Sequence, residues 1–321
     1  MSLIEQAAKR LEQLRRAGVD LSRPAKDSGQ PIVAAMPAIE PVSAVPLAGS
    51  DGVPVVPSPS PAAAQMSRRV DLDLNALAVA GLISPDAPRS QLADQYRVIK
   101  RPLIANAMGR GATPIKRGNL IMVTSALSGE GKTFSAVNLA MSIAMELDNT
   151  VMLVDADVPK PSVLKMLGLP AAPGLLDVLT DESTSLSQVI LRTNVDKLSL
   201  LPSGTQHPRA TELLASEMMA KLLDEMASRY PDRIIIFDSP PLLMTTESRV
   251  LATHMGQVVV VVKAESTVRG DVKHALSAIE ACPVKLLLLN QARASSQDGY
   301  GYGYGYGYGY GYGYGYGSDG T

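Results

Sequence analysis

The chain has 321 residues, of which 46% are hydrophobic, and its 30 Lys and Arg nearly balance its 31 Asp and Glu. This composition is typical of a globular protein with one or two domains, and the formal net charge of −1 gives no reason to expect a nucleic-acid partner. The lone Cys282 excludes an internal disulfide and a cysteine-ligated metal, and the sequence shows neither a secretory leader nor an apolar stretch of the roughly 20 residues that span a bilayer. We therefore expect a cytoplasmic protein that does not itself cross the membrane.

The first 67 residues divide into two segments. Residues 1–30 open with apolar side chains every three or four positions between residues 2 and 17, which predicts an amphipathic helix. Such a helix could dock a partner, self-associate or lie on a membrane surface, and a frayed helix without a special function is the alternative. Residues 31–67 carry eight prolines among Ala, Val and Ser without a helical or strand period, which predicts an extended disordered linker.

Ordered structure is expected over residues 68–297. The first predicted helix runs from Gln91 to Leu103, where Pro102 is expected to limit it. From residue 119, short runs rich in Val, Ile and Leu alternate with helical patterns, and these runs are apolar on both faces. The alternation predicts an α/β fold with a mostly parallel sheet flanked by helices, with strands at 119–125, 150–154, 198–202, 233–237, 257–262 and 284–289 and helices at 131–147, 211–229 and 267–280.

The first of these strands leads directly into a phosphate-binding loop, which makes the predicted fold P-loop NTPase-like. Residues 126–133 read ALSGEGKT, a P-loop in which Ala126 replaces the first glycine. Its glycines let backbone N–H groups close around phosphate oxygens, while Lys132 reaches the β- and γ-phosphates and Thr133 offers its hydroxyl to Mg²⁺. The residues expected to contact the nucleotide here are Ser128, Gly129, Glu130, Gly131, Lys132, Thr133 and Phe134.

Acidic residues follow two further predicted strands. Asp155 and Asp157 share a parity that, if their strand continues that far, points both side chains the same way, and Asp238 ends a later strand. The carboxyl ends of parallel strands face the same crevice as the P-loop. These carboxylates are therefore expected to hold Mg²⁺ and to accept a hydroxyl proton. A turn or helix cap before Pro159 is the alternative for the first two.

In combination, these motifs resemble those of the bacterial tyrosine kinases, P-loop enzymes unrelated to the eukaryotic protein kinases. They are most similar to the exosortase-associated tyrosine autokinases of exopolysaccharide loci. The resemblance covers roughly residues 68–321 and includes the segments 173–179 and 201–204 and a C-terminal tyrosine cluster. It implies ATP- and Mg²⁺-dependent phosphorylation of tail tyrosines between subunits of an oligomer, which regulates polysaccharide synthesis or export.

The resemblance also implies roles for individual residues. The catalytic set would be Lys132, Asp155, Asp157 and Asp238, and the Mg²⁺ ligands would be Thr133, Asp155 and Asp238. Asp157 would act as the base that takes the hydroxyl proton, and Asn290 would recognise the base of the nucleotide. The chain departs from the family at Pro159, where the usual pattern has a basic residue and this chain has Lys160 one position later.

An oligomerising helix of the family has a counterpart in this chain. Asp94, Arg97 and Lys100 repeat its charge order at a spacing of three, with a shorter acid and Lys for Arg, and positions three apart share a helix face. The implied assembly is a homo-oligomer, ring-like in form. A solvated charged face without a partner is the alternative.

The chain ends in a Tyr-Gly repeat, which we expect to be an autophosphorylation tail over residues 298–321. Sequence alone leaves open whether a tail enters its own active site or that of a neighbour, and the resemblance favours the neighbour. The expected phosphate acceptors are Tyr300, Tyr302, Tyr304, Tyr306, Tyr308, Tyr310, Tyr312, Tyr314 and Tyr316.

The resemblance further implies partners. These are a separate transmembrane chain-length regulator that activates the kinase and recruits it to the inner face of the membrane, and a tyrosine phosphatase. Two other functions stay open. A partitioning or positioning ATPase of the deviant Walker A class has the same fold, but it carries a signature lysine where this chain has Leu127. A catalytically weak, nucleotide-dependent scaffold is the other, for which Ala126 and Pro159 provide the best support.

Overall fold

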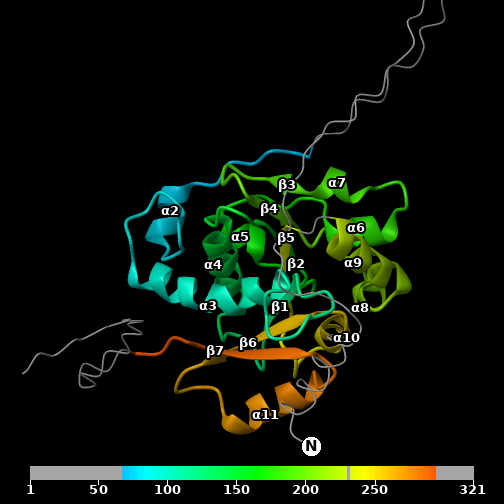
Figure 1. Cartoon of the computed structure of the whole chain (residues 1–321). Coiled ribbons are helices and arrows are strands. Elements are labelled where there is room, and N and C mark those ends of the chain that lie inside the picture. Colours follow the sequence, from blue (N-terminus) through cyan, green and yellow to red (C-terminus); the bar gives the residue numbers. More distant parts are fainter. Residues whose placement is uncertain (1–66, 230–231, 294–321) are drawn as a thin grey trace, which may run out of the picture. The chain divides into compact units, whose positions relative to one another are not determined.

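The computed structural model of the chain describes residues 67–229 and 232–293 (Figure 1). The predicted N-terminal helix, the proline-rich linker and the tyrosine-rich tail lie outside these residues. Within the described part, no helix combines the length and the apolar composition that crossing a bilayer requires.

A seven-stranded sheet with the order β3-β4-β2-β5-β1-β6-β7 forms the centre of the described structure. Neighbouring strands are parallel, except that β3 runs antiparallel to β4. All six predicted strands are confirmed, whereas the two-residue strand β3 is too short to give a sequence pattern. The strands are β1 (Leu120–Ser125), β2 (Thr150–Asp155), β3 (Leu191–Arg192), β4 (Leu198–Leu201), β5 (Arg233–Asp238), β6 (Gln257–Lys263) and β7 (Val284–Asn290).

Helices cover both faces of the sheet, and each face has its own apolar core. Alternate residues of the central strands face opposite sides, so Ile121 packs with α3 and α4, whereas Met122 packs with α6, α9 and α10. The helices are α2 (Leu74–Val79), α3 (Gln91–Ala107), α4 (Lys132–Ala144), α5 (Val163–Met166), α6 (Leu175–Thr180), α7 (Leu186–Val189), α8 (Ala210–Leu214), α9 (Glu217–Arg229), α10 (Glu247–Thr253) and α11 (Arg269–Ala278).

Two predicted helices differ from the observed ones. The helix predicted from Gln91 does not end at Pro102, since α3 continues to Ala107. Pro102 has no N–H to donate to the Val98 carbonyl, but Val98 is an exposed residue, so water can reach this carbonyl instead. The pattern at 211–229 forms two helices, because the Ser216 hydroxyl accepts a hydrogen bond from the Met219 N–H at 3.2 Å and so caps a new start for α9.

The edge strand β7 also departs from the expectation that every strand is buried on both faces. Leu288 is buried, but Leu287 and Leu289 are 57% and 63% exposed. One face of β7 is therefore open to the surface over part of its length.

Candidate active site

The P-loop connects the end of β1 to the start of α4. Gly129 and Gly131 have φ angles of +84° and +91°, which L-residues with a side chain rarely adopt, and Gly131 is the N-cap of α4. A Cβ atom on Gly131 would also collide with the side-chain amide of Asn290. The loop thus has the close backbone turn and the helix N-terminus that together form a phosphate cradle.

Glu130 stabilises this loop from within. Its side chain is buried; one carboxylate oxygen accepts the Leu127 N–H at 2.7 Å, and the other accepts the hydroxyl of Thr267. We expected Glu130 among the nucleotide contacts, and the structure directs its carboxylate away from that role. Thr267 lies 137 positions further along the chain, and no motif in the sequence points to it.

The Thr267→Val variant should therefore weaken the P-loop. Loss of the hydroxyl leaves one Glu130 oxygen buried without its donor, which costs about 1–3 kcal/mol. We expect a lower melting temperature and a several-fold weaker affinity for ATP, measured by thermal denaturation and by nucleotide titration. Thr253→Val, at an exposed position of α10, is the matched control. Unchanged ATP affinity in Thr267→Val would show that the loop does not depend on this contact.

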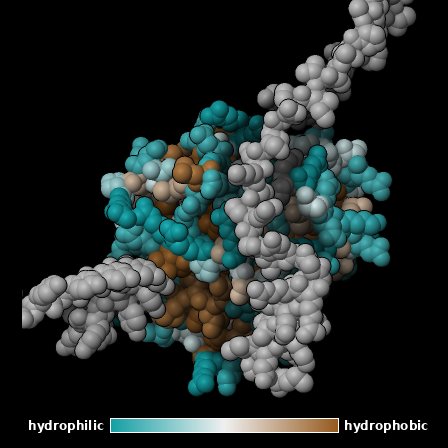
Figure 2. Space-filling model, viewed as in Figure 1, coloured by the Kyte–Doolittle hydropathy of each residue, from teal (hydrophilic) through white to brown (hydrophobic). Residues whose placement is uncertain are grey.

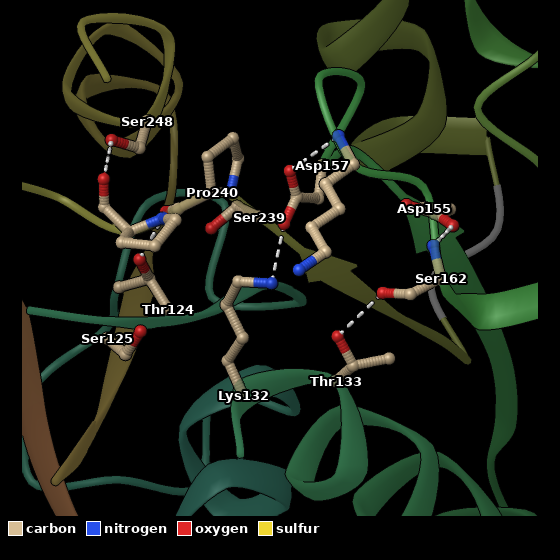
Figure 3. A network of polar contacts seen from close by, with 12 residues as sticks. Thr124, Ser125, Lys132, Thr133, Asp155, Asp157, Ser162, Ser239, Pro240 and Ser248 are labelled. Atoms are coloured by element: carbon tan, nitrogen blue, oxygen red, sulfur yellow. Dashed lines mark hydrogen bonds and ion pairs between the residues drawn. The ribbon is translucent and has the colours of Figure 1, made fainter. Parts of the chain in front are cut away.

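Lys132 and Asp157 form a buried ion pair at the start of α4. The Lys132 Nζ lies 2.5 Å from Asp157 Oδ2, and the two side chains are 12% and 4% exposed (Figure 3). The other carboxylate oxygen of Asp157 accepts the Lys160 N–H at 3.3 Å, whereas the Lys160 side chain belongs to an exposed residue. The pair places a cation at the P-loop and holds a carboxylate beside it.

Asp155 is directed toward different partners. Strand β2 ends at Asp155, so the condition for Asp155 and Asp157 to point the same way is not met. One Asp155 oxygen accepts the N–H groups of Ser162 and Val163 at 3.0 and 2.9 Å, and the other oxygen is buried without a hydrogen-bond partner among the described residues. Burial raises the pKa of Asp155 to about 6 against the effect of these two donors.

Asp238, at the end of β5, pairs in register with Asp155. The Asp238 carboxylate is fully buried, and both of its oxygens lack a hydrogen-bond partner within the described part of the chain. Burial raises the pKa of Asp238 to about 7, although the nearby charge of Lys132 opposes the shift.

These orphaned oxygens fit the expected Mg²⁺ site. The Thr133 hydroxyl lies 3.1 Å from the Ser162 hydroxyl, and the Ser162 N–H donates to Asp155. Ser162 is thus a common neighbour of the Thr133 hydroxyl and the Asp155 carboxylate. No group of three His, Cys, Asp or Glu side chains that could hold a metal occurs among residues 67–229 and 232–293. Mg²⁺ seldom needs such a group, because phosphate oxygens and water complete its shell. Thr133, Asp155 and Asp238 are the residues that would hold it.

Three other expected nucleotide contacts lie in different settings. Ser128 is exposed in the loop, and Phe134 packs partly buried against the core on the α3 side. Asn290 is next to the P-loop, as expected, but its amide donates to the Glu130 carbonyl at 2.9 Å and its oxygen accepts the Gln291 N–H. In this arrangement Asn290 holds the loop, and its recognition of a nucleotide base stays a prediction.

A pocket of about 650 Å³ adjoins Asp155. Pro173, Ser203 and Gly204 contribute to its wall. They belong to the segments 173–179 and 201–204, which lie side by side because the Leu175 and Leu176 N–H groups donate to the carbonyls of Pro202 and Ser203 at 2.8 and 3.0 Å. The carboxylate of Asp177 closes this junction by accepting the N–H groups of Gly174 and Thr205. A cavity with both apolar and polar walls thus opens beside Asp155.

The expected interface residues of α3 do not share one exposed face. Asp94 accepts a hydrogen bond from Arg97 at 2.8 Å, and both side chains are accessible. Lys100 instead is 5% exposed and turned toward α4, where its ammonium bonds the Ser142 carbonyl and lies 2.7 Å from Glu146. The predicted grouping of Asp94, Arg97 and Lys100 on one accessible face is therefore wrong for Lys100, because Ser142 and Glu146 hold its ammonium within the fold.

Comparison with known proteins agrees with this site. Residues 118–285 match the family described as an AAA domain. The tyrosine-protein kinase YwqD of Bacillus subtilis is 33% identical over 221 residues, which cover 68% of this chain and 89% of YwqD. The tyrosine-protein kinase Ptk of Acinetobacter johnsonii is 34% identical over 56% of this chain and 24% of Ptk. The tyrosine-protein kinase Wzc of Salmonella typhi is 31% identical over 57% of this chain and 26% of Wzc.

Solved structures show the same relationship. The chimerical protein CapA2B2 aligns with a TM-score of 0.57 and 28% identity over 71% of this chain and 95% of that chain. The kinase domain of VpsO aligns with a TM-score of 0.53 and 26% identity over 63% of this chain and 96% of its own. The chain spans most of YwqD and of these two structures, but only about a quarter of Ptk and Wzc. The chain therefore belongs to the family of bacterial tyrosine-protein kinases.

Proposed function

We propose that the chain is an ATP- and Mg²⁺-dependent autokinase that phosphorylates the tyrosines of its own C-terminal repeat. The observation that carries this proposal is the group of one cation and three carboxylates around the P-loop: Lys132, Asp155, Asp157 and Asp238. The repeat begins close to this group along the chain, because Asn290 bonds the P-loop and Tyr300 follows ten positions later.

The residues of the site would divide the chemistry between them. Bound ATP with Mg²⁺ supplies the phosphoryl group and neutralises part of its charge. Lys132 stabilises negative charge at the loop, and Thr133, Asp155 and Asp238 hold the metal. Asp157, oriented by the Lys160 N–H, takes the proton of the phenolic hydroxyl.

The pocket beside Asp155 is suited to hold the acceptor tyrosine. A phenol ring is apolar on its faces and polar at its tip, and this pocket combines apolar side chains such as Leu164 and Pro173 with polar groups such as Thr205. A tyrosine that enters the pocket with its hydroxyl foremost would bring this hydroxyl toward Asp155.

We propose further that the acceptor tail comes from a neighbouring subunit of a homo-oligomer, ring-like in form, in which Asp94 and Arg97 contribute to the interface. Nine phosphates of about −1.5 to −2 charge each would make the tails repel one another. We therefore expect the unphosphorylated protein to assemble and the phosphorylated protein to dissociate. Equal sizes of the two forms in light scattering would contradict this expectation.

Two substitutions on α3 distinguish a residue that contributes to the proposed subunit interface from one that stabilises the fold. Arg97→Ala should lower the average mass in light scattering and leave the melting temperature unchanged, because Arg97 pairs only at the surface with Asp94. Lys100→Ala should instead destabilise the fold by about 2 kcal/mol, since it removes buried charged hydrogen bonds to Ser142 and Glu146. If Lys100→Ala instead lowered the average mass of the assembly without lowering its stability, Lys100 would be part of the subunit interface.

The partners are proposed from the family. They are a separate transmembrane chain-length regulator that activates the kinase and brings it to the inner face of the membrane, and a tyrosine phosphatase that resets the tail. The cycle would control exopolysaccharide synthesis or export.

The proposal is tested by intact mass spectrometry of the purified chain after incubation with Mg-ATP. We expect several additions in steps of one phosphate that map to residues 300–316, and none in a variant with phenylalanine at all nine tail positions. Release of ADP without added phosphate would favour a partitioning or positioning ATPase. Bound nucleotide with neither product would favour a scaffold.

A further inference from the structure

A groove of about 800 Å³ runs between helix α3 and the edge strand β7 and includes Asn290 at the end of this strand among its lining residues. Figure 2 shows a hydrophobic patch on this face, below α3 where Figure 1 places β6 and β7. Val98, Leu287 and Leu289 line the groove and are 69%, 57% and 63% exposed. No Asp, Glu, Lys or Arg is among the lining residues. The groove is thus an uncharged apolar surface that a partner of the same character would cover.

Strand β7 is also open along one edge. It lies at the end of the sheet, and among the described residues its ladder is formed with β6 alone, from Val284 to Asn290. The outer backbone N–H and C=O groups of an edge strand are a template for a further extended segment. Groove and edge together favour an extended, uncharged, aromatic or apolar occupant.

The chain itself provides such a segment at the end of the groove. Gln291 and Ala292 line the groove, and Tyr300 follows eight residues after Ala292. Eight extended residues reach about 26 Å, whereas the seven residues of β7 span about 23 Å, so every part of the groove lies within reach of the repeat. From Tyr300 to Gly317 the repeat contains no charged residue.

The repeat also has the period that an edge strand requires. Alternate residues of an extended chain point to the same face, so in this conformation a Tyr-Gly repeat presents every tyrosine on one side and only hydrogen on the other. On the face of β7 opposite α3, the ring side could cover the exposed Leu287 and Leu289, while the glycine side would face α3. The polar amide of Gln291 in the groove is available for a phenolic hydroxyl.

We propose that the groove between α3 and β7 binds part of the unphosphorylated Tyr-Gly repeat of the same chain, a stretch of residues 300–317 about as long as the seven-residue β7, as an extended segment along this strand, and that tyrosine phosphorylation releases it. The docking is argued from the groove and the sequence, whereas the release rests on the proposed kinase activity. A phosphotyrosine brings about −1.5 to −2 charge into a groove whose lining residues include no cation, so each phosphate that enters the groove opposes docking. The docked repeat is withheld from active sites, and release makes the remaining tyrosines available.

Disulfide trapping in the full chain tests the docking. Leu289→Cys is combined with Tyr308→Cys, and the matched control combines Leu147→Cys with Tyr308→Cys, because Leu147 is an 88% exposed leucine outside the groove. The native Cys282 is buried and contributes a constant background. After phosphatase treatment, we expect the disulfide within one chain to form at least ten times faster in the groove pair than in the control pair. Equal rates would overturn the proposal.

Mixing isotope-labelled and unlabelled chains identifies the occupant. Disulfides that join a labelled chain to an unlabelled one would show that a second copy or its tail fills the groove, which also overturns the proposal. Leu287→Asp, an exposed substitution, should reduce the groove-pair rate to the control rate without lowering the melting temperature. A groove-pair rate that survives Leu287→Asp would place the repeat elsewhere.

A second stage separates docking from kinase activity. After incubation with Mg-ATP, the phosphates on the repeat are counted by mass and the trapping is repeated. Phosphorylated chains should lose the difference between groove and control pairs. Added phosphate with an unchanged difference would overturn phosphorylation-driven release. Absence of added phosphate together with the expected trapping difference would leave the docking supported and count against kinase activity of the chain without its activator.

Discussion

The Lys132→Met variant is expected to incorporate no measurable phosphate under conditions in which the wild-type chain gains several. The Lys132 ammonium is held at the start of α4 by Asp157 at 2.5 Å and is 12% exposed, so a single cation is preorganised at the cradle. Loss of one preorganised group that stabilises developing charge costs about 10²–10³ in rate, and loss of the P-loop cation should be at least as large. Intact mass after incubation with Mg-ATP measures the effect.

Lys132→Met also leaves Asp157 buried without its partner, so a loss of folding could imitate a loss of chemistry. The melting temperature of the variant must therefore be compared with that of the wild type. Lys221→Met, an exposed lysine of α9, is the matched control and should keep full activity. If a folded Lys132→Met chain still gained phosphate on its tail tyrosines, Lys132 would not be required for the reaction.

The Asp238→Asn variant is expected to be inactive and, without nucleotide at pH 8, more stable than the wild type. Both carboxylate oxygens of Asp238 are buried without a hydrogen-bond partner among the described residues, so the ionised group destabilises the fold. An amide removes the charge at nearly constant shape. We expect a stabilisation of about 1–3 kcal/mol at pH 8, measured by urea denaturation, together with loss of Mg²⁺-dependent phosphate transfer.

The same group predicts a pH dependence. The pKa of Asp238 is about 7 in the folded chain and near 4 when unfolded, so between these values the folded state binds more protons. Stability of the nucleotide-free protein should therefore fall as pH rises from 5 to 8, by up to a few kcal/mol, and Asp155, with a pKa of about 6, acts in the same direction. Asp238→Asn should flatten the curve. A wild-type stability that rises over this range would contradict the assigned burial of charge.

Sequence reasoning succeeded where a single local pattern dictates the structure. The P-loop and the apolar strands around it were predicted because glycine, lysine and strand residues must occur there in a fixed order. The rule that parallel strands end at one edge predicted that Asp155 and Asp238 lie side by side, and the register of β2 with β5 pairs them.

The failures concern contacts between distant segments. The burial of Lys100 depends on where the C-terminal end of α4 offers Ser142 and Glu146, which no helical pattern reveals. Likewise, the partner of Glu130 is Thr267, far along the chain, and its nearest sequence neighbours give no hint of it. Pro102 within α3 shows the same limit, because the cost of a missing hydrogen bond depends on whether water can reach the carbonyl.

The hydrogen bond between Asn290 and the Glu130 carbonyl fixes the root of the tail beside the nucleotide loop of its own chain. A tethered reactant meets its target at an effective concentration set by the tether length, and not by the amount of protein in solution. Once subunits have assembled, the supply of acceptors at each active site should therefore be constant on dilution. If, as proposed, assembled subunits phosphorylate these tails, the rate per subunit depends on the fraction of subunits that are assembled. A change in cellular kinase level would then alter the onset of the reaction more than its speed within each assembly.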